Sequence, residues 1–159
     1  MEKIILGIDP GIADTGYGFI KVNGSRLECL EYGSIKTPAG QAMPLRLQTL
    51  YKELKRLVKK HQPQSAAMEQ LFFNKNVSTA LIVGQARGVA ILAISQAGVS
   101  ILDFTPGQVK QAVSAYGQAS KLQVQKMVKL ILKLKELPQP DDAADALAVA
   151  ICGANQRQY

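Results

Sequence analysis

The sequence predicts a single α/β domain built on a five-stranded mixed sheet flanked by helices. Residues 3–9 form an unbroken aliphatic run, which is typical of a strand buried on both faces. Residues 15–22 and 27–35 continue as strand patterns joined by a tight turn at Asn23-Gly24, so we expect three antiparallel strands first. A helix then precedes a short strand at residues 65–69, and such a crossover places that strand parallel to the first one.

The first helix is predicted over residues 45–61. Its leucines recur at helical spacing while its lysines lie mostly off that stripe, so the helix is amphipathic with a basic outer face. For these lysines we favour ordinary solvation over direct contact with nucleic acid. His61, the only histidine, ends this helix, where we expect it to support the helix C-terminus rather than to bind a metal.

Residues 77–97 form the most hydrophobic stretch, and its length raises the question of a membrane span. Gln85 and Arg87 fall near its middle, where a charge facing lipid is costly, so we expect a soluble helix and no membrane partner. Arg87 should pair with an acid or a backbone carbonyl. A helix without a polar face must be buried all round, either within the domain or against a second subunit.

The rest of the chain predicts one more strand and three helices. Residues 99–104 form the fifth strand, and Thr105-Pro106 begins a helix with proline at an early position, which the missing amide permits. A lysine-bearing helix over residues 121–132 and an alanine-rich helix after residue 140 complete the chain. Because no repeat, low-complexity tract or linker divides it, residues 1–159 should form one domain.

A formal net charge of +7 favours a polyanionic partner, and charge alone allows DNA, RNA or a membrane surface. Cys29 and Cys152 are far apart, with neither metal-ligand spacing nor the density of a disulfide scaffold. The apolar run at the N-terminus is too short for the core of a signal peptide. These features predict a cytoplasmic protein.

Four acidic residues are the candidates for chemistry. Asp9 and Glu69 each end a predicted strand, and because the two strands are parallel both carboxylates should emerge at one sheet edge, where ligands gather in open α/β sheets. Asp142 and Asp145 are three residues apart, so on a helix they project from one face. Asp141 points elsewhere or serves as the N-cap.

Each acid also has a purely structural interpretation. Asp9 could shape the Asp-Pro-Gly turn, Glu69 could be a surface acid, and Asp142 could favour the helix start through capping and the helix dipole. Asp145 fits such an interpretation poorly, because it lies among alanines and a leucine on a side that should be buried. A carboxylate there needs a partner, and a divalent cation shared with Asp9 and Glu69 would be one.

The predicted ligand set indicates magnesium or manganese rather than zinc, because it is rich in oxygen and lacks Cys/His pairs. Two such ions about 3.5–4 Å apart can activate water and stabilise the leaving oxygen of a phosphodiester. The acids would then be metal ligands, not proton shuttles. Phe72 and Phe73 follow in a loop, where they could stack on unpaired bases or cover the core.

Several motifs follow one another along the chain, and they are Gly7-Ile8-Asp9-Pro10-Gly11 with Thr15-Gly16-Tyr17-Gly18, Glu69-Gln70 with Phe72-Phe73 and Asn76, Gly84-Gln85-Ala86-Arg87-Gly88, Gln108-Val109-Lys110, Lys121 with Gln123-Val124-Gln125, and Asp142-Ala143-Ala144-Asp145-Ala146-Leu147. In order and spacing they resemble the RuvC family of Holliday junction resolvases over almost the whole chain. One departure is Ala115, where the family often has a glycine before Tyr116-Gly117.

The resemblance implies a ribonuclease H-like fold and a homodimeric, magnesium-dependent endonuclease of homologous recombination and DNA repair. Such an enzyme cuts two opposed strands of a four-way DNA junction. The long apolar helix would form much of the dimer contact, and a branch-migration motor complex is a candidate partner. Two Mg²⁺ ions per active site are implied, with Mn²⁺ able to substitute.

The resemblance also assigns roles to individual residues. The catalytic residues and metal ligands would be Asp9, Glu69, Asp142 and Asp145. Phe72 matches an aromatic residue that contacts junction bases, with Phe73 beside it, and Lys110 and Lys121 match basic residues near the cleaved phosphate, so the DNA-binding set would be Phe72, Phe73, Lys110 and Lys121.

Three other functions remain open. The glycine-rich start also resembles the phosphate loop of actin-like ATPases and sugar kinases, but those proteins need two lobes and roughly twice this length. A structure-selective DNA-binding module would keep the fold and the dimer without cutting, and four intact acids argue against it. A related nuclease could act on RNA, which a comparison of DNA junctions with RNA hairpins would reveal.

Overall fold

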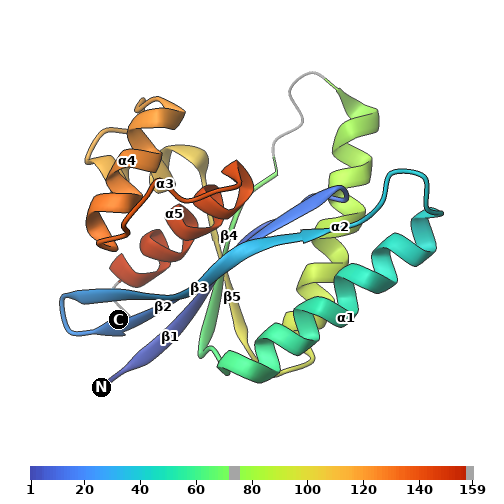
Figure 1. The fold of residues 1–159 in the computed structure, drawn as a ribbon, viewed down its shortest axis with the longest axis horizontal. Helices are drawn as coiled ribbons and strands as arrows, with labels where there is room; N and C mark the ends of the chain where they lie inside the picture. Colours follow the sequence, from blue (N-terminus) through green and yellow to red (C-terminus); the bar gives the residue numbers. More distant parts are fainter. Residues whose placement is uncertain (72–75, 157–159) are drawn as a thin grey trace.

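The computed structural model describes residues 1–71 and 76–156, and its architecture is the mixed α/β sheet that the sequence predicts (Figure 1). Five strands lie in the order β3-β2-β1-β4-β5. β1 pairs antiparallel with β2 and parallel with β4, which in turn pairs parallel with β5. The strands are β1 (Lys3–Asp9), β2 (Asp14–Asn23), β3 (Arg26–Lys36), β4 (Ser65–Glu69) and β5 (Ser100–Phe104). The helices are α1 (Met43–His61), α2 (Val77–Ser95), α3 (Pro106–Ser114), α4 (Lys121–Ile131) and α5 (Asp141–Asn155).

The hairpin between β2 and β3 turns one residue later than predicted. Asn23 pairs with Arg26, so the two-residue turn is Gly24-Ser25 rather than Asn23-Gly24. Gly24 has a φ of 58°, in the left-handed region that glycine adopts without strain. The glycine therefore takes the first turn position, and Asn23 stays in the strand.

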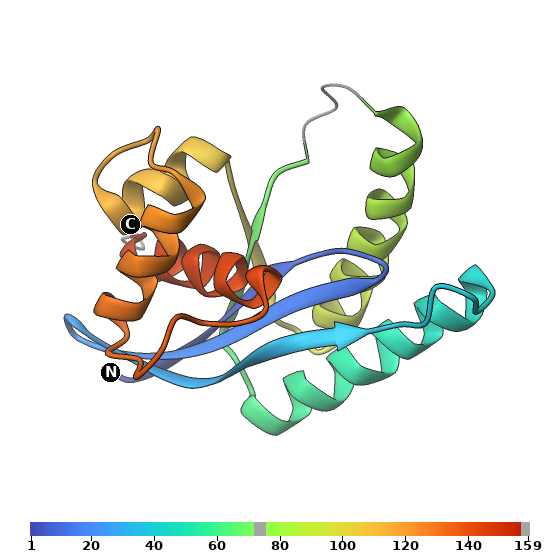
Figure 2. The same ribbon diagram turned by 45° about the horizontal axis from the view of Figure 1, so that its top comes forward.

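Helices cover both faces of the sheet: α1 and α2 lie on one face, and α3, α4 and α5 lie on the other (Figures 1 and 2). Because side chains alternate along a strand, neighbouring residues of β1 enter different cores. Leu6 packs with Phe19 in the core that α1 and α2 cover. Ile5 packs with Ile20 and Leu147 in the core that α5 covers. Residues of both cores are fully buried, so a single sheet organises two hydrophobic layers.

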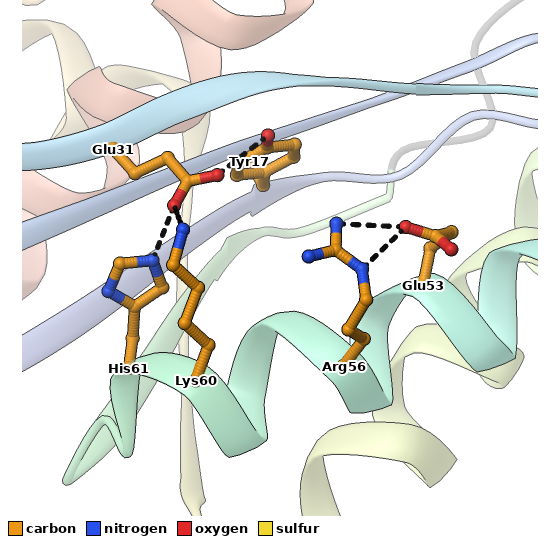
Figure 3. Close-up of polar contacts among 6 residues, drawn as sticks. All are labelled: Tyr17, Glu31, Glu53, Arg56, Lys60 and His61. Carbon is orange, nitrogen blue, oxygen red and sulfur yellow. Dashed lines mark hydrogen bonds and ion pairs between the residues drawn. The ribbon is translucent and has the colours of Figure 1, made fainter.

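A polar cluster around Glu31 ties the end of α1 to β3 (Figure 3). His61 Nε2 and Lys60 Nζ lie 2.7 and 2.5 Å from Glu31 Oε2, and the His61 ring stacks on Phe19 with centroids 4.1 Å apart. The hydrogen bond from Lys60 lowers the pKa of Glu31. His61 thus joins the helix end to the sheet, which agrees with the structural role predicted for it.

α5 lies directly on β1 and β2, and two glycines make this contact possible. A Cβ on Gly7 would lie 1.9 Å from the backbone oxygen of Ala146, and a Cβ on Gly16 would lie 1.9 Å from that of Asp142. Atoms cannot approach so closely, and in both cases the clashing atom belongs to the helix backbone. Because Gly16 pairs with Asp9 across the strands, these glycines set how closely α5 approaches the end of β1.

α2 is apolar around most of its surface, but the described part of this chain covers only one side of it. Ala86, Ala90 and Ile94 are buried, whereas Leu81 and Leu92 are 61% and 50% exposed. Of the two predicted alternatives, burial of the whole helix within the domain is therefore wrong, because the sheet and α1 contact one side only, and burial against a second subunit stays a prediction. By length and composition it is also the one described helix that could cross a membrane, and 22% of its most apolar 18-residue segment is buried.

We expect Gly16→Ala to lower the free energy of unfolding by about 1–3 kcal/mol, because the added Cβ must displace the backbone of α5. Urea unfolding followed by circular dichroism measures this loss. Gly40→Ala is the matched control, since a Cβ there meets no atom within 4 Å. Equal stability of the two variants would contradict the close contact between α5 and the sheet.

Candidate active site

Asp9 and Glu69 occupy the same edge of the sheet, as predicted. β1 and β4 are adjacent and parallel, with Ile8 paired to Met68, so the next residue of each strand stands at its carboxyl end. Both acids are half-buried. The strands therefore deliver two carboxylates to one place, at the end of the sheet where the chain leaves β4 toward α2.

The first turns of α5 bring two more carboxylates to Asp9. Ligand oxygens of Asp9, Asp142 and Asp145 all lie within 4.8 Å of one another, and the three residues are half-buried. Asp142 stands in the first turn of α5, and Asp145 follows at a spacing that places both on one helix face. Within residues 1–71 and 76–156, this trio is the one group of His, Cys, Asp or Glu side chains close enough to hold a metal ion.

Negative charge is concentrated around Asp9. Burial, followed by the charges of Asp145, Asp142 and Glu69, raises the pKa of Asp9 to about 8. A carboxyl group with this pKa keeps its proton near neutral pH unless a cation offsets the surrounding charge. The arrangement therefore favours a positive ion between the carboxylates.

The pKa values of Glu69 and Asp145 are raised by the same surroundings, and one lysine lowers each of them. Burial and then the charge of Asp145 raise the pKa of Glu69, while Lys110 lowers it. Burial likewise raises the pKa of Asp145, and Lys121 lowers it. In return, the charge of Asp145 raises the pKa of Lys121. The site therefore holds a group of carboxylates with two lysine ammonium groups beside it. This arrangement suits a metal ion at the carboxylates and a phosphate at the lysines.

A cavity of about 310 Å³ opens beside these acids. Its polar lining consists of Asp9, Glu69, Asp145, Lys110 and Lys121, and apolar residues of α3, α4 and α5 line the rest. Glu69 stands on the cavity wall, outside the compact trio. Lys110 and Lys121, predicted only from the family resemblance, thus lie in the same cavity as the acids.

Asp141 has a role that sequence reasoning missed. Lys121 Nζ lies 3.5 Å from both Asp141 Oδ2 and Asp145 Oδ2. The buried Gln125 donates from Nε2 to Asp141 Oδ1 at 3.1 Å. The N-cap of α5 is Pro140, so the suggestion that Asp141 caps the helix is wrong, and its side chain points to α4 instead. Because the contact joins two helices, spacing within α5 could not reveal it.

Arg87 holds the backbone at the end of β4. Its Nη1 donates to the backbone oxygen of Glu69 at 2.8 Å, and its Nη2 pairs with the carboxylate of Asp103. The prediction of an acid or a carbonyl as partner is confirmed for both groups. The sequence indicated a partner for Arg87 because this residue is a lone charge in an apolar helix. That the partner is the backbone of Glu69 depends on the packing of α2 against β4 and β5.

Two other predicted features fall near the site. Phe72 and Phe73 lie outside the described residues. Ala115 is the C-cap of α3 and has a φ of 57°, a conformation that glycine adopts at lower cost. The glycine usual at this position in the resembled family therefore has a conformational reason, and alanine accepts some strain here.

Comparison with known proteins identifies similar chains over nearly the full length. The family model described as crossover junction endodeoxyribonuclease RuvC matches residues 5–153. A relative with this name from Heliobacterium modesticaldum is 55% identical over 152 residues, which cover 96% of this chain and 94% of the relative. Another from Alkaliphilus oremlandii is 55% identical over 156 residues, which cover 98% of this chain and 95% of the relative.

Solved structures give the same result. T. thermophilus RuvC in complex with Holliday junction substrate superposes with a TM-score of 0.91 at 35% identity, covering 96% of this chain and 93% of that one. The yeast mitochondrial Holliday junction resolvase superposes with a TM-score of 0.68 at 18% identity, covering 94% of this chain and 77% of that one, which is evidence for the fold alone. The predicted ribonuclease H-like fold is confirmed.

We expect Asp9→Asn to stabilise the metal-free protein at about pH 8 more than at about pH 5. Folding raises the pKa of Asp9 from 3.8 to about 8, so within this window the folded chain binds more protons than the unfolded chain, and stability falls as pH rises. Asparagine removes this penalty, and three pH units at about 1.4 kcal/mol each give about 4 kcal/mol as the upper limit of the difference between the two pH values. Urea unfolding in the presence of a chelator measures the change.

Glu28→Gln is the control for this experiment, because Glu28 is an exposed carboxylate on β3. We expect it to change stability little at either pH. If Asp9→Asn had the same effect at both pH values, the raised pKa of Asp9 would be wrong.

Proposed function

Because this chain belongs to the RuvC family of crossover junction endodeoxyribonucleases, we propose that it is a structure-specific endonuclease that resolves four-way DNA junctions in homologous recombination and DNA repair. The observation that carries this proposal is the trio of Asp9, Asp142 and Asp145 at the sheet edge. It occurs in a chain that resembles a junction-bound relative over 96% of its length. Two symmetric cuts in opposed strands would separate the joined duplexes.

The donor groups fit a hard divalent cation. Half-buried carboxylate oxygens lie within 4.8 Å of one another, and the raised pKa of Asp9 reflects negative charge that a cation would offset. We assign Mg²⁺, with two ions per active site and Mn²⁺ as a substitute. Asp9, Glu69, Asp142 and Asp145 would hold these ions.

The reaction we propose is hydrolysis of a phosphodiester. When bound, the cations would activate a water molecule and stabilise charge on the leaving oxygen. Asp9 serves as a ligand only after losing its proton, which the bound cations favour by lowering its pKa. Lys121, held at the cavity by Asp141 and Asp145, can neutralise the phosphate, and Lys110 can do so from the side of Glu69.

The proposed DNA contacts extend from the cavity to the segment after β4. The net charge of +7 supports binding to a polyanion. Phe72 and Phe73 follow Glu69 closely in the chain, and we assign them to stacking on bases at the junction centre. The described start of this segment is fixed, because the Gln70 N–H donates to the oxygen of Phe104 at 2.8 Å.

The proposed active form is a homodimer joined through α2. Leu81, Ile82 and Leu92 are exposed on this helix, and a shared interface would remove them from water. A Cβ on Gly84 or Gly88 would meet nothing within 4 Å, so a partner helix has room to approach. Two-fold symmetry would direct two active sites at opposed strands. A branch-migration motor complex is the further partner we propose, and the cytoplasm is the proposed location.

We expect the purified protein to nick a synthetic four-way DNA junction in paired, symmetric positions when Mg²⁺ is present and not when a chelator is present. Asp9→Asn should retain junction binding and reduce cleavage by at least about 10³-fold, because an amide is a poor replacement for an anionic ligand. Denaturing gel electrophoresis measures the nicks, and a mobility shift measures binding.

A linear duplex of the same sequence is the substrate control, and Asp14→Asn is the protein control. Asp14 is an acid at the start of β2, outside the metal-binding trio, where it pairs with Lys36. Cleavage by Asp9→Asn at the wild-type rate would overturn the assignment of Asp9. Binding without any cleavage by the wild-type protein would leave a DNA-binding module as the better description.

We expect Leu81→Glu combined with Leu92→Glu to convert the dimer to a monomer, because two carboxylates cannot be buried at an apolar interface. Analytical ultracentrifugation measures the change in mass. Leu130→Glu is the matched control, since Leu130 is a leucine of α4 that is 69% exposed. If the double variant stays dimeric, the subunits meet through another surface.

A further inference from the structure

A groove of about 950 Å³ lies between α1 and α2, on the face of the sheet that these helices cover. The last turns of α1 form one wall, and the end of α2 with the segment before β5 forms the other. The lining combines apolar and cationic side chains, among them Val58, Ala93, Val99, Lys55, Arg56 and Lys59. None of the described residues that line it is acidic.

The groove and the catalytic cavity lie at opposite ends of β4. Pro63, just before this strand, lines the groove, whereas Glu69 at its end lines the cavity. The five residues of β4 span about 16 Å at about 3.3 Å per residue. In Figure 1, α1 and α2 both end on the side of the molecule where β4 and β5 begin. The groove is therefore separate from the acids that we assign to cleavage.

Two lysines give the groove an uncompensated positive charge. Lys55 and Lys59 are exposed on α1, and neither forms an ion pair within the described part of the chain. Lys55 Nζ lies over the ring of Tyr51, 5.1 Å from its centroid. Arg56, by contrast, pairs with Glu53 at 2.9 Å (Figure 3). Lys55 and Lys59 are thus available to an anionic partner.

Internal contacts hold the groove in shape. The hydroxyl of Tyr51 on α1 donates to the side-chain oxygen of Gln96 at the end of α2. α1 ends at His61, and the C-cap residue Gln62 takes the left-handed conformation with a φ of 48° and donates its N–H to the oxygen of Val58 at 2.8 Å. A preformed groove needs little ordering when a partner binds, which favours affinity.

We propose that this groove binds an acidic, amphipathic segment of a partner protein. Its carboxylates would face Lys55 and Lys59, and an apolar side chain would lie against the exposed Ala97 and the aliphatic stems of these lysines, above the buried Val58, Ala93 and Val99. Charge complementarity favours such a partner over a second copy of this chain, because the copy itself carries a net charge of +7.

A protein segment also fits the groove better than nucleic acid does. A DNA strand would offer phosphates to the lysines, but its backbone carries no aliphatic side chain that could enter the groove, and the lining contains no aromatic side chain on which a base could stack. Ala93 lies about 100° around α2 from Leu92 and about 16 Å along the helix from Ile82, and Ala97 lies beyond the end of the helix. A bound segment would therefore leave the proposed dimer face of α2 free.

The test uses a short fluorescent peptide in which glutamates alternate with leucines, with fluorescence anisotropy as the readout. We expect Lys55→Glu combined with Lys59→Glu to weaken peptide binding at least about tenfold, and Ala97→Trp to weaken it as well, because the indole would fill the groove. A peptide with lysines in place of the glutamates should not bind. Circular dichroism establishes that each variant is folded.

The control protein carries Arg26→Glu and Lys135→Glu, which reverse two exposed charges on other surfaces and should leave peptide binding unchanged. Junction cleavage by the Lys55 and Lys59 variant should also stay at the wild-type rate, so failure of this proposal is distinguishable from failure of the proposed nuclease function. The proposal is overturned by an absence of peptide binding, by an equal loss in the control protein, or by a matching loss of affinity for four-way junction DNA.

Discussion

The close contact of α5 with β1 and β2 is the constraint on which the rest of the site depends. Gly7 and Gly16 have no Cβ, so the helix backbone can lie where side chains would otherwise keep it away. This contact places Asp142 and Asp145 next to Asp9. With larger residues at the two glycines, the strand-end carboxylate and the helix carboxylates would be separated, and no compact ligand set would form.

The same contact has an electrostatic consequence. Carboxylates brought together in a partly buried site repel one another, as the pKa of about 8 at Asp9 reflects. Lys121 relieves part of this repulsion, and Asp141 with Gln125 fixes where Lys121 stands. The fold thus accepts an unfavourable charge cluster that a bound cation can stabilise, which is common at functional sites.

The two faces of the sheet serve different purposes. On one face, α5 completes the acidic cluster, and α3 and α4 carry the lysines of the cavity. On the other, α1 and α2 leave an apolar helix surface and a basic groove open. Arg87 connects the helices of this face with the active site, because its side chain reaches from α2 to the backbone of Glu69. A partner bound to α2 would therefore act on the element that holds the end of β4 in place.

The sequence by itself determined the strand pattern, the parallel crossover and the shared sheet edge of Asp9 and Glu69, because strand ends and helical spacing follow from the order of residue types along the chain. It also indicated that Arg87 needs a partner. Only the tertiary structure decided that Glu69 stands outside the compact trio, that Asp141 holds Lys121, and that one side of α2 stays uncovered. These facts depend on contacts between elements far apart in the chain. The spacing of residues along one element does not determine such contacts.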